Sequence, residues 1–544
     1  MKNKAKYLPY IIIFIFSLFM TCIFKLSYIN GDDSLFHIAN INVIKDNLFN
    51  LSKIRPIIAN NYGYGIGIFY PQLPHIIGGL LSLITSFIKF DPYIGIKLTK
   101  FIILFVSGIS MYSYINKLYK SKIKGLIGSI TYITSSYFIV DIFYRDALNE
   151  SFIFMFMPIV FLGLYYLLEE EKIYKFFIFF VLGYVGLMFS HLVLSVWFTL
   201  YVVVFLLFNI KKVLNKKVFL SLVCSSIIIL LLTSVFTIPM IEHMRVGDYY
   251  VFSRVYKATD IWRISCKDYL YMHLVKTSNS YLFVNIAVIT LISCFLSFIK
   301  LLRGDTKVKR YLIIFLILSG FGVLCTFNLH IWKIIPSMLR NIQFAWRSAT
   351  FVLFFITIYS VDGLDYIYKI YKNKYLTTIV ILVLLSVHLF ISVDNIVLTK
   401  SIDECTSTCG MGWQKEYLPL EAWNSDYINT RSEGIIILNG DGNININKNN
   451  VPNMIFTVSK IDKELEIELP RIYYLGYSIK DNKGNKINYK KDKNGFIKIK
   501  INNTGKYTVK YTGTILDIIF KYLSIITLIG YIFIIILLKK KDKD

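Results

Sequence analysis

Two adjacent carboxylates and a histidine stand together near the start of the chain, in the stretch GDDSLFHIANI (31–41). Asp32, Asp33 and His37 follow directly on a long apolar segment. Such groups can transfer protons or bind charged ligands, and placing them beside a membrane is costly. Asp33 could also cap a helix that begins at Ser34, and this structural role is compatible with a chemical one.

Further polar side chains occur at the ends of other apolar segments. They are Tyr144, Arg145 and Glu150 in YRDALNE; His191 in FSHLVL; Glu242, His243 and Arg245 after IPM; and Gln343, Trp346 and Arg347 in IQFAWRS. Each has a simple explanation on its own, because arginines extend to lipid headgroups and tryptophans anchor helices at the interface. Those explanations do not account for why all of these residues fall at the same depth, at the outer ends of the predicted membrane spans. We therefore expect them to line one polar pocket.

The composition indicates a polytopic membrane protein. The chain has 544 residues, of which 55% are hydrophobic and only 17% are charged, against about 25% charged residues in soluble proteins. Its net charge of +26 is concentrated in short loops between apolar runs, where lysine and arginine set topology and meet anionic lipid. No basic soluble domain with interleaved aromatics is visible, which argues against nucleic-acid binding.

The charge pattern predicts which loops face the cytoplasm. The basic N-terminus, the loops at 116–124, 169–175, 209–217, 300–310 and 368–374 and the tail KKKDKD should be cytoplasmic. This requires the segment 72–90 to lie on the outer surface without crossing. The first apolar run is long and lacks an A-x-A site, so we expect a retained helix and not a cleaved signal peptide.

About 12 crossings follow from this reading. They are expected at 8–28, 95–116, 123–142, 151–168, 174–190, 192–209, 217–240, 280–300, 310–328, 346–368, 375–394 and 515–538. The predicted organisation is a transmembrane domain over 1–394 with a first outer loop at 29–94, an outer domain over 395–513, and a final helix with a basic tail over 514–544.

The segment 395–513 differs in composition from the rest. Strand-like alternation appears in GIIIL, NMIFTV, LEIELP, FIKIKI and YTVKYT, separated by the turn signals GDGN, DNKGN and DKNG. We expect a small β-sandwich that faces outside. Cys405 and Cys409 in CTSTC could form a disulfide there.

Familiar catalytic motifs are missing from the sequence. It contains no P-loop, HExxH or G-x-S-x-G motif, and the alternating glycines of YGYGIGIFYP lack the strand–turn–helix setting of a nucleotide fingerprint. That stretch is better explained as a tight surface loop.

An ordered set of stretches resembles a known family. GDDSLFHIANI resembles H-D-x-x-F-H-x-x-R-I, with Asp32 and Asn40 in place of its histidine and arginine. NYGYGIGIFYP resembles G-Y-G-x-x-x-x-F-Y-P, YRDALNES resembles Y-x-R-x-A-x-G-E with Asn149 for the glycine, and IQFAWRS resembles I-Q-F-P-W-R with Ala345 for the proline. SHLVLS matches a helix-end histidine, and EYLP (416–419) and YYLGYSI resemble parts of the outer domain. The chain thus resembles the GT-C superfamily of membrane glycosyltransferases, and most closely the bacterial proteins of the YfhO kind, also described as 6-pyruvoyl-tetrahydropterin synthase related.

The resemblance implies transfer of a sugar from a polyprenyl-phosphate donor to a glycan, a teichoic-acid-like polymer, a lipid or a protein outside the cell. Asp33 would be the base, with Asp32 sharing that role or helping to hold a divalent metal. Arg145 and Arg347 would bind phosphate. The other residues expected to contact substrate are His37, Tyr144, Glu150, His191, Glu242, Gln343 and Trp346.

Two other function classes stay open at this stage. A lipid or polysaccharide transporter would need polar residues that continue into the cytoplasmic half of the spans, where only Asp141 and Asp362 stand near membrane ends. A non-catalytic envelope assembly protein would use the outer domain as its binding module.

Overall fold

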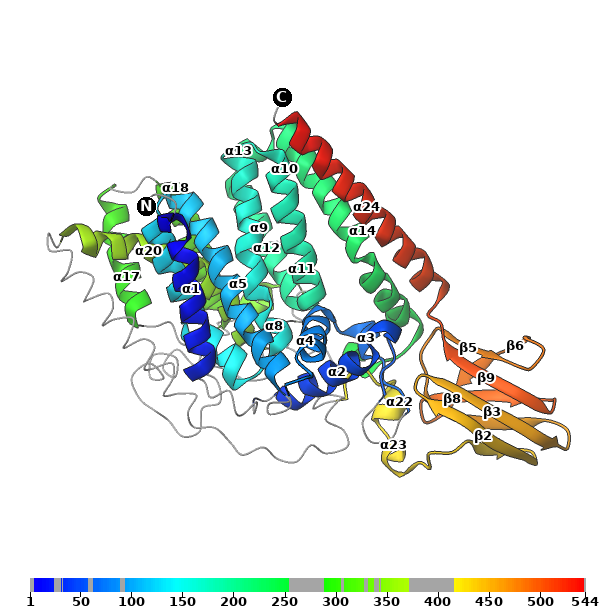
Figure 1. Ribbon diagram of the computed structural model, residues 1–544. Helices are drawn as coiled ribbons and strands as arrows, with labels where there is room; N and C mark the ends of the chain where they lie inside the picture. Colours follow the sequence, from blue (N-terminus) through cyan, green and yellow to red (C-terminus); the bar gives the residue numbers. More distant parts are fainter. Residues whose placement is uncertain are drawn as a thin grey trace.

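The computed structural model describes residues 4–23, 31, 33–56, 62–88, 93–253, 288–304, 308–326, 331–336, 342, 344–370 and 415–542. Within these ranges the molecule is mostly helical and carries a sheet domain close to its C-terminal end (Figure 1). This confirms the coarse fold class expected from the sequence.

The helices fall into two length groups. The longer ones are α1 (Lys4–Ile23), α2 (Ser34–Asn47), α4 (Leu73–Ile84), α5 (Ile94–Tyr119), α6 (Lys122–Ile133), α9 (Ile153–Leu168), α11 (Leu182–Ser190), α12 (Leu192–Phe208), α14 (Lys216–Val246), α17 (Val288–Leu302), α18 (Lys309–Thr326), α20 (Ala349–Ile370) and α24 (Ile515–Lys541). Those of a single turn are α3 (Ile66–Phe69), α7 (Ser136–Ile139), α8 (Leu148–Ser151), α10 (Ile173–Phe176), α13 (Ile210–Val213), α15 (Tyr250–Ser253), α19 (Ile331–Ile334), α22 (Leu420–Trp423) and α23 (Tyr427–Thr430).

Six stretches of the described chain are helical, long and apolar enough to cross a membrane, or seven if one bent pair counts as a span. They are Ile94–Tyr119, Leu148–Leu168, Ile173–Ser190, Lys216–Val246, Lys309–Thr326 and Ile515–Lys541. The described residues therefore do not reach the expected total of about 12. The apolar parts of α1, α12 and α17 are shorter, α20 is not among the six, and the predicted span 375–394 lies outside the described residues.

The expected span 123–142 is not one continuous helix, and it counts as a candidate crossing only if its two parts are taken together. Its two parts, Lys122–Ile133 and Tyr137–Phe143, are bent by 50° relative to each other. The second part runs into a π-helix at Val140–Tyr144, a conformation that is rare and often found at functional sites. The chain continues from this bend through a buried polar segment, 145–151.

The helix within the segment 72–90 is short for a membrane crossing. This helix, α4, has 12 residues, which gives a length of about 18 Å, against roughly 30 Å for the hydrocarbon core. Gly78 and Gly79 allow α4 to pack closely on α2, because a Cβ at either position would lie 2.7 Å from Ile41 or Ile44.

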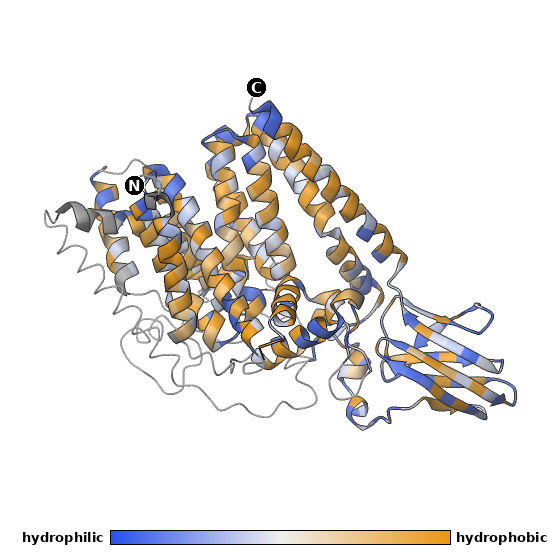
Figure 2. Ribbon diagram, in the orientation of Figure 1, coloured by the Kyte–Doolittle hydropathy of each residue, from blue (hydrophilic) through white to orange (hydrophobic). Residues whose placement is uncertain are grey.

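Both chain ends lie at the same end of the helical part. In Figure 1 the start of α1 and the end of α24 are at the top, and α2, α3, α4 and the sheet domain are at the bottom. Figure 2 shows hydrophilic residues at the upper helix ends and mainly hydrophobic ones between. The apolar window of α24 is only 6% buried, which is typical of a helix that faces lipid.

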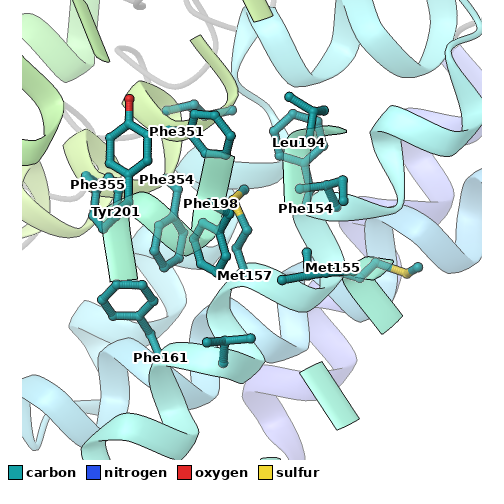
Figure 3. Close-up of a cluster of buried hydrophobic side chains, with 14 of the residues drawn as sticks. Phe154, Met155, Met157, Phe161, Leu194, Phe198, Tyr201, Phe351, Phe354 and Phe355 are labelled. Carbon is teal, nitrogen blue, oxygen red and sulfur yellow. The ribbon is translucent and has the colours of Figure 1, made fainter. Parts of the chain in front are cut away.

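An aromatic core holds the helices together. Phe161 of α9 lies 5.2 Å from Phe354 of α20 between ring centroids and 5.9 Å from Phe198 of α12. Figure 3 shows these side chains converging with Tyr201 and Phe351. Rings at such separations add attraction to the burial of their area, so this core fixes the helices that carry the polar segment.

Two antiparallel sheets make up the C-terminal domain, with strand orders β1-β4-β8-β7 and β2-β3-β9-β5-β6. The strands are β1 (Ile436–Asn439), β2 (Gly442–Asn450), β3 (Asn453–Ile461), β4 (Leu465–Ile472), β5 (Tyr477–Lys480), β6 (Lys486–Ile487), β7 (Tyr489–Lys491), β8 (Phe496–Ile501) and β9 (Gly505–Tyr511). Phe456, Ile467 and Val509 from both sheets are buried in one core, which is the arrangement of a sandwich.

The sheet domain also contacts the first loop of the chain. The Ile472 N–H donates to the carbonyl oxygen of Tyr62 over 3.0 Å, and the Tyr62 hydroxyl donates to the carbonyl oxygen of Arg431 over 2.7 Å. The Tyr474 hydroxyl donates to the carbonyl oxygen of Tyr417 over 2.9 Å. The domain is thus joined to the residues that follow α2 as well as to its neighbours in sequence.

Candidate functional site

The start of α2 is fixed by the polar segment that follows the π-helix. The Asp33 N–H donates to the Arg145 carbonyl oxygen over 2.9 Å, and the Gly31 N–H donates to Asp146 Oδ2 over 3.1 Å. A Cβ on Gly31 would lie 2.6 Å from the Arg145 carbonyl carbon, so only glycine allows this approach. Asp33 occupies the predicted N-cap position, but its side chain makes no capping hydrogen bond.

Glu150 stands at the centre of a buried charge cluster. Its Oε2 accepts from Arg145 Nη1 and Nη2 over 3.2 and 3.3 Å and from Arg347 Nε over 3.2 Å. Its Oε1 accepts from the Tyr137 hydroxyl over 3.1 Å. Arg145 also donates to Asp141 over 2.5 Å. Two arginines therefore balance two carboxylates in a region where all four side chains are buried.

Trp346 covers this cluster from one side. The Arg145 guanidinium carbon lies 4.1 Å from the centroid of the Trp346 ring, a cation–π contact. Burial acts to lower the pKa of Arg145, but Glu150 and Asp141 outweigh it and the pKa is raised. The guanidinium therefore stays charged.

Two histidines form a buried pair beside α2. The separation between His37 Nδ1 and His75 Nε2 is 2.8 Å, and His37 Nε2 accepts from the Leu148 N–H over 3.3 Å. His37 must therefore carry its proton on Nδ1 and donate it to His75. Burial first, and then His75, Lys100 and Arg145, hold the pKa of His37 well below its usual value. Burial lowers the pKa of His75 to about 3, so both rings are neutral.

A second ion pair lies on the far side of His37. Lys100, buried in α5, is paired with Asp146, which also accepts from the Ser34 hydroxyl. Asp146 adopts a left-handed backbone with φ 55°, a conformation that aspartate tolerates better than most residues. A cavity of about 10 Å³ lies among Ser34, His37, Lys100 and Asp146, room for roughly one water molecule.

His191 and Asn149 complete the buried region. His191 Nδ1 accepts from the Leu194 N–H over 3.3 Å and caps α12. Burial, and then Arg347, lower its pKa to about 3. The Asn149 amide donates to the carbonyl oxygens of Pro71 and Ser190 over 2.8 Å each, which ties three distant segments together.

The structure brings most of the expected residues together. Asp33, His37, Arg145, Glu150, His191, Trp346 and Arg347 belong to one region, with Asp33 half-buried and the others buried. Glu242 does not join them, because it accepts from the Thr514 hydroxyl at the start of α24. Asp32, Gln343, Cys405 and Cys409 lie outside the described residues, as does the Tyr144 side chain.

Sequence reasoning missed several members of this region. They are His75, Lys100, Tyr137, Asp146 and Ser151, and Asp141 was noted only for its place near a membrane end. Lys100 carried a signal, since a lysine inside an apolar run is costly unless it is paired. Among the described residues, no group of three or more His, Cys, Asp or Glu side chains is placed to hold a metal ion.

Comparison with known proteins gives no functional description. No family model matches the sequence. The chain is similar to an uncharacterized protein of Lactococcus lactis subsp. cremoris (strain MG1363), at 23% identity over 600 aligned positions that cover 99% of this chain and 96% of the other. The likeness therefore extends over nearly the whole length of both chains.

Proposed function

We propose that the chain is a membrane glycosyltransferase of the GT-C kind, which transfers a sugar from a polyprenyl-phosphate donor to an acceptor of the cell envelope outside the cell. The observation that carries the proposal is the junction of Asp33 with the Arg145–Glu150–Arg347 cluster. The Asp33 backbone is hydrogen-bonded to the backbone of Arg145, whose guanidinium group shares Glu150 with that of Arg347, so a half-buried aspartate lies beside two guanidinium groups from distant parts of the chain.

The reaction needs a proton acceptor and a group that stabilises the departing phosphate. In the proposed step Asp33 takes the proton from the acceptor hydroxyl while that oxygen attacks the anomeric carbon. The bond between this carbon and the phosphate oxygen breaks, and polyprenyl phosphate leaves with the electron pair. Arg347 and Arg145 face the leaving phosphate, because guanidinium groups pair well with its oxygens.

The other residues have supporting roles in this proposal. Glu150 holds both guanidinium groups in place, and Trp346 packs against one of them. Neutral His37 fixes the turn at Leu148 through its hydrogen bond. Asp32 and a divalent metal could assist the base.

Replacing Asp33 with Asn tests the base. D33N should release no polyprenyl phosphate from a panel of polyprenyl-phosphate sugars, while the protein still inserts and folds. Asp46 offers a matched control in the same helix, since it is exposed and its carboxylate forms an ion pair with Lys45 over 3.7 Å at the surface. D46N should retain activity, and full activity in D33N would remove Asp33 from the base role.

A non-catalytic assembly protein is the second candidate. It is favoured by the closure of the buried cluster, whose arginines are paired with carboxylates and whose adjacent cavity of about 10 Å³ has room for roughly one water molecule. In that case no sugar donor of the panel would be consumed, and a D33A/R145A double variant that still folds would support envelope assembly as well as the parent chain does.

A further inference from the structure

The outer face of the five-stranded sheet carries lysines and no acidic residue. Its strands β2, β3, β9, β5 and β6 contain neither Asp nor Glu. Strand register places Lys448, Ile455, Thr508, Lys480 and Lys486 opposite one another in a single row across the sheet. Directly opposed residues share a face, so this row lies on one side.

Two more lysines extend the same face along β9. Lys506 and Lys510 are exposed and flank Thr508 at alternate positions, whereas Tyr507 and Val509 between them are buried in the core. Neutral hydrogen-bonding side chains fill the space between the lysines. They are Asn445, Asn447, Thr457, Ser478 and Thr508.

The two sheets differ in how many of their lysines form ion pairs with carboxylates. On the four-stranded sheet, Lys498 lies 3.2 Å from Glu466 and Lys500 lies 2.7 Å from Glu464. In the described part of the chain, none of the five outward lysines of the other sheet has a carboxylate within ion-pair distance. The strands of the five-stranded sheet therefore carry five outward lysines without an ion pair, against one such lysine, Lys490, in the described strands of the four-stranded sheet.

We propose that this lysine face binds an extended polyanion, a chain of phosphate groups joined by hydroxyl-bearing units. Lysines attract phosphates as point charges, and the amides and hydroxyls between them can bond the neutral units. The row from Lys448 to Lys486 spans about 19 Å across the sheet, and Lys506 and Lys510 lie about 13 Å apart along β9. One phosphate headgroup could not reach these lysines together, whereas a polymer could.

A membrane surface fits this face less well. Peripheral membrane-binding surfaces combine basic residues with inserted Trp, Phe or Leu side chains. Ile455 is the large apolar residue at the outward positions named above, and it is partly buried. The proposal concerns binding alone and does not depend on the transfer reaction.

Full-length protein in neutral-lipid nanodiscs provides the test, with synthetic poly(glycerol phosphate) as the probe. The parent should bind the polymer, and K506Q/K510Q should weaken binding by roughly ten- to thirtyfold at low salt. The slope of log K against log salt should fall by about 1.4, since two phosphate contacts are lost. The matched control is K498Q/K500Q, which removes the same charge from the opposite sheet and should change binding less than about twofold.

Several results would overturn the proposal. One is the absence of polymer binding by the parent, and another is an equal loss in both double variants, which would reflect net charge alone. A third is capture of the nanodiscs by phosphatidylglycerol vesicles that is lost in K506Q/K510Q while polymer binding is unchanged. That outcome would assign the face to a membrane.

Discussion

At the scale of single residues, Glu150 balances the charge of the buried cluster. It accepts hydrogen bonds from both Arg145 and Arg347 and is 2% exposed. Removing one partner of a buried ion pair leaves an uncompensated charge and typically costs about 3–5 kcal/mol. E150Q should therefore lower the free energy of unfolding by about 3 kcal/mol, measured by denaturation with dodecyl sulfate in mixed micelles.

Glu464 provides the control for this prediction. Its ion pair with Lys500 is shorter, at 2.7 Å against 3.2 Å, but the side chains are 48% and 65% exposed. Exposed pairs contribute less than about 1 kcal/mol, so E464Q should be close to neutral. Equal effects of the two substitutions would contradict a buried role for Glu150.

The buried histidine pair predicts an acid-sensitive fold. A histidine titrates near 6.5 when unfolded, whereas the folded pKa of His75 is about 3 and that of His37 is also lowered. Below pH 6.5 the unfolded chain therefore takes up protons that the folded chain does not. The contribution of the two neutral histidines to the free energy of unfolding is fully present above pH 6.5. It falls with decreasing pH, by up to about 1.4 kcal/mol per pH unit for each histidine.

Comparison of thermal unfolding at pH 7.5 and 5.5 measures this effect. Exposed carboxylates titrate below this window, and the comparison with H75Q isolates the part that depends on the histidine pair. The midpoint Tm should fall for the parent chain, and the fall should be smaller in H75Q. A pH dependence that is the same in both chains would show that the pair is not responsible.

Only part of this site was predictable, because its partners are set by tertiary contacts. Asp33, Arg145, Glu150 and Arg347 were found from the sequence by their shared place at helix ends. The pairing of Lys100 with Asp146 links α5 to a loop 46 residues later, and no local pattern marks it. Glu242 also lies near the end of a helix, but its side chain accepts a hydrogen bond from Thr514 and does not join the cluster. A position near a helix end does not determine the direction in which the side chain points.

At the scale of elements, Gly163 allows α9 to pack closely against the helical stretch Ile173–Ser190, which precedes His191. A Cβ at this position would lie 2.7 Å from the backbone nitrogen of Phe180, closer than side chains tolerate. G163A should destabilise the fold by about 1–3 kcal/mol through overpacking. Gly530 in α24 has no atom within 4 Å of the equivalent position, so G530A should be neutral or slightly stabilising. Both are measured by the same mixed-micelle denaturation, and a neutral G163A would contradict the close packing.

Helices and strands were easier to predict where the sequence shows one clear hydrophobic pattern. The expected spans 95–116, 217–240 and 515–538 correspond to α5, α14 and α24 within a few residues, because long apolar runs fix helices strongly. The bend between Ile133 and Tyr137 and the π-helix at Val140–Tyr144 were both missed, since the apolar run continues through them without a glycine or proline. Strand β2 was missed as well, because its sequence GNININKNN is rich in asparagine, which strands disfavour.

At the scale of the whole molecule, the loop between α2 and α4 is held against the segment that leads into the sheet domain. The first loop carries the pair Arg55 and Tyr64 as a β-bridge, and the Tyr417 N–H donates to the Tyr64 hydroxyl over 3.2 Å. Phe69 from the same loop stacks on Tyr417 at 5.7 Å. A ligand on the sheet domain would therefore act on a body that also contacts the residues between α2 and α4.

The arrangement of the chain ends predicts which parts are accessible from each side of the membrane. Helix α24 has 27 residues, a length of about 40 Å, which is enough to cross the hydrocarbon core. Its basic end at Lys539–Lys541 should be cytoplasmic, so the sheet domain at its other end should be outside. In intact cells, a membrane-impermeant thiol reagent should label K506C but label K540C only after permeabilisation. The parent chain, whose native cysteines stay in place, supplies the background. Labelling of K540C in intact cells with K506C protected would reverse the topology and would remove the proposed active site from the outer face.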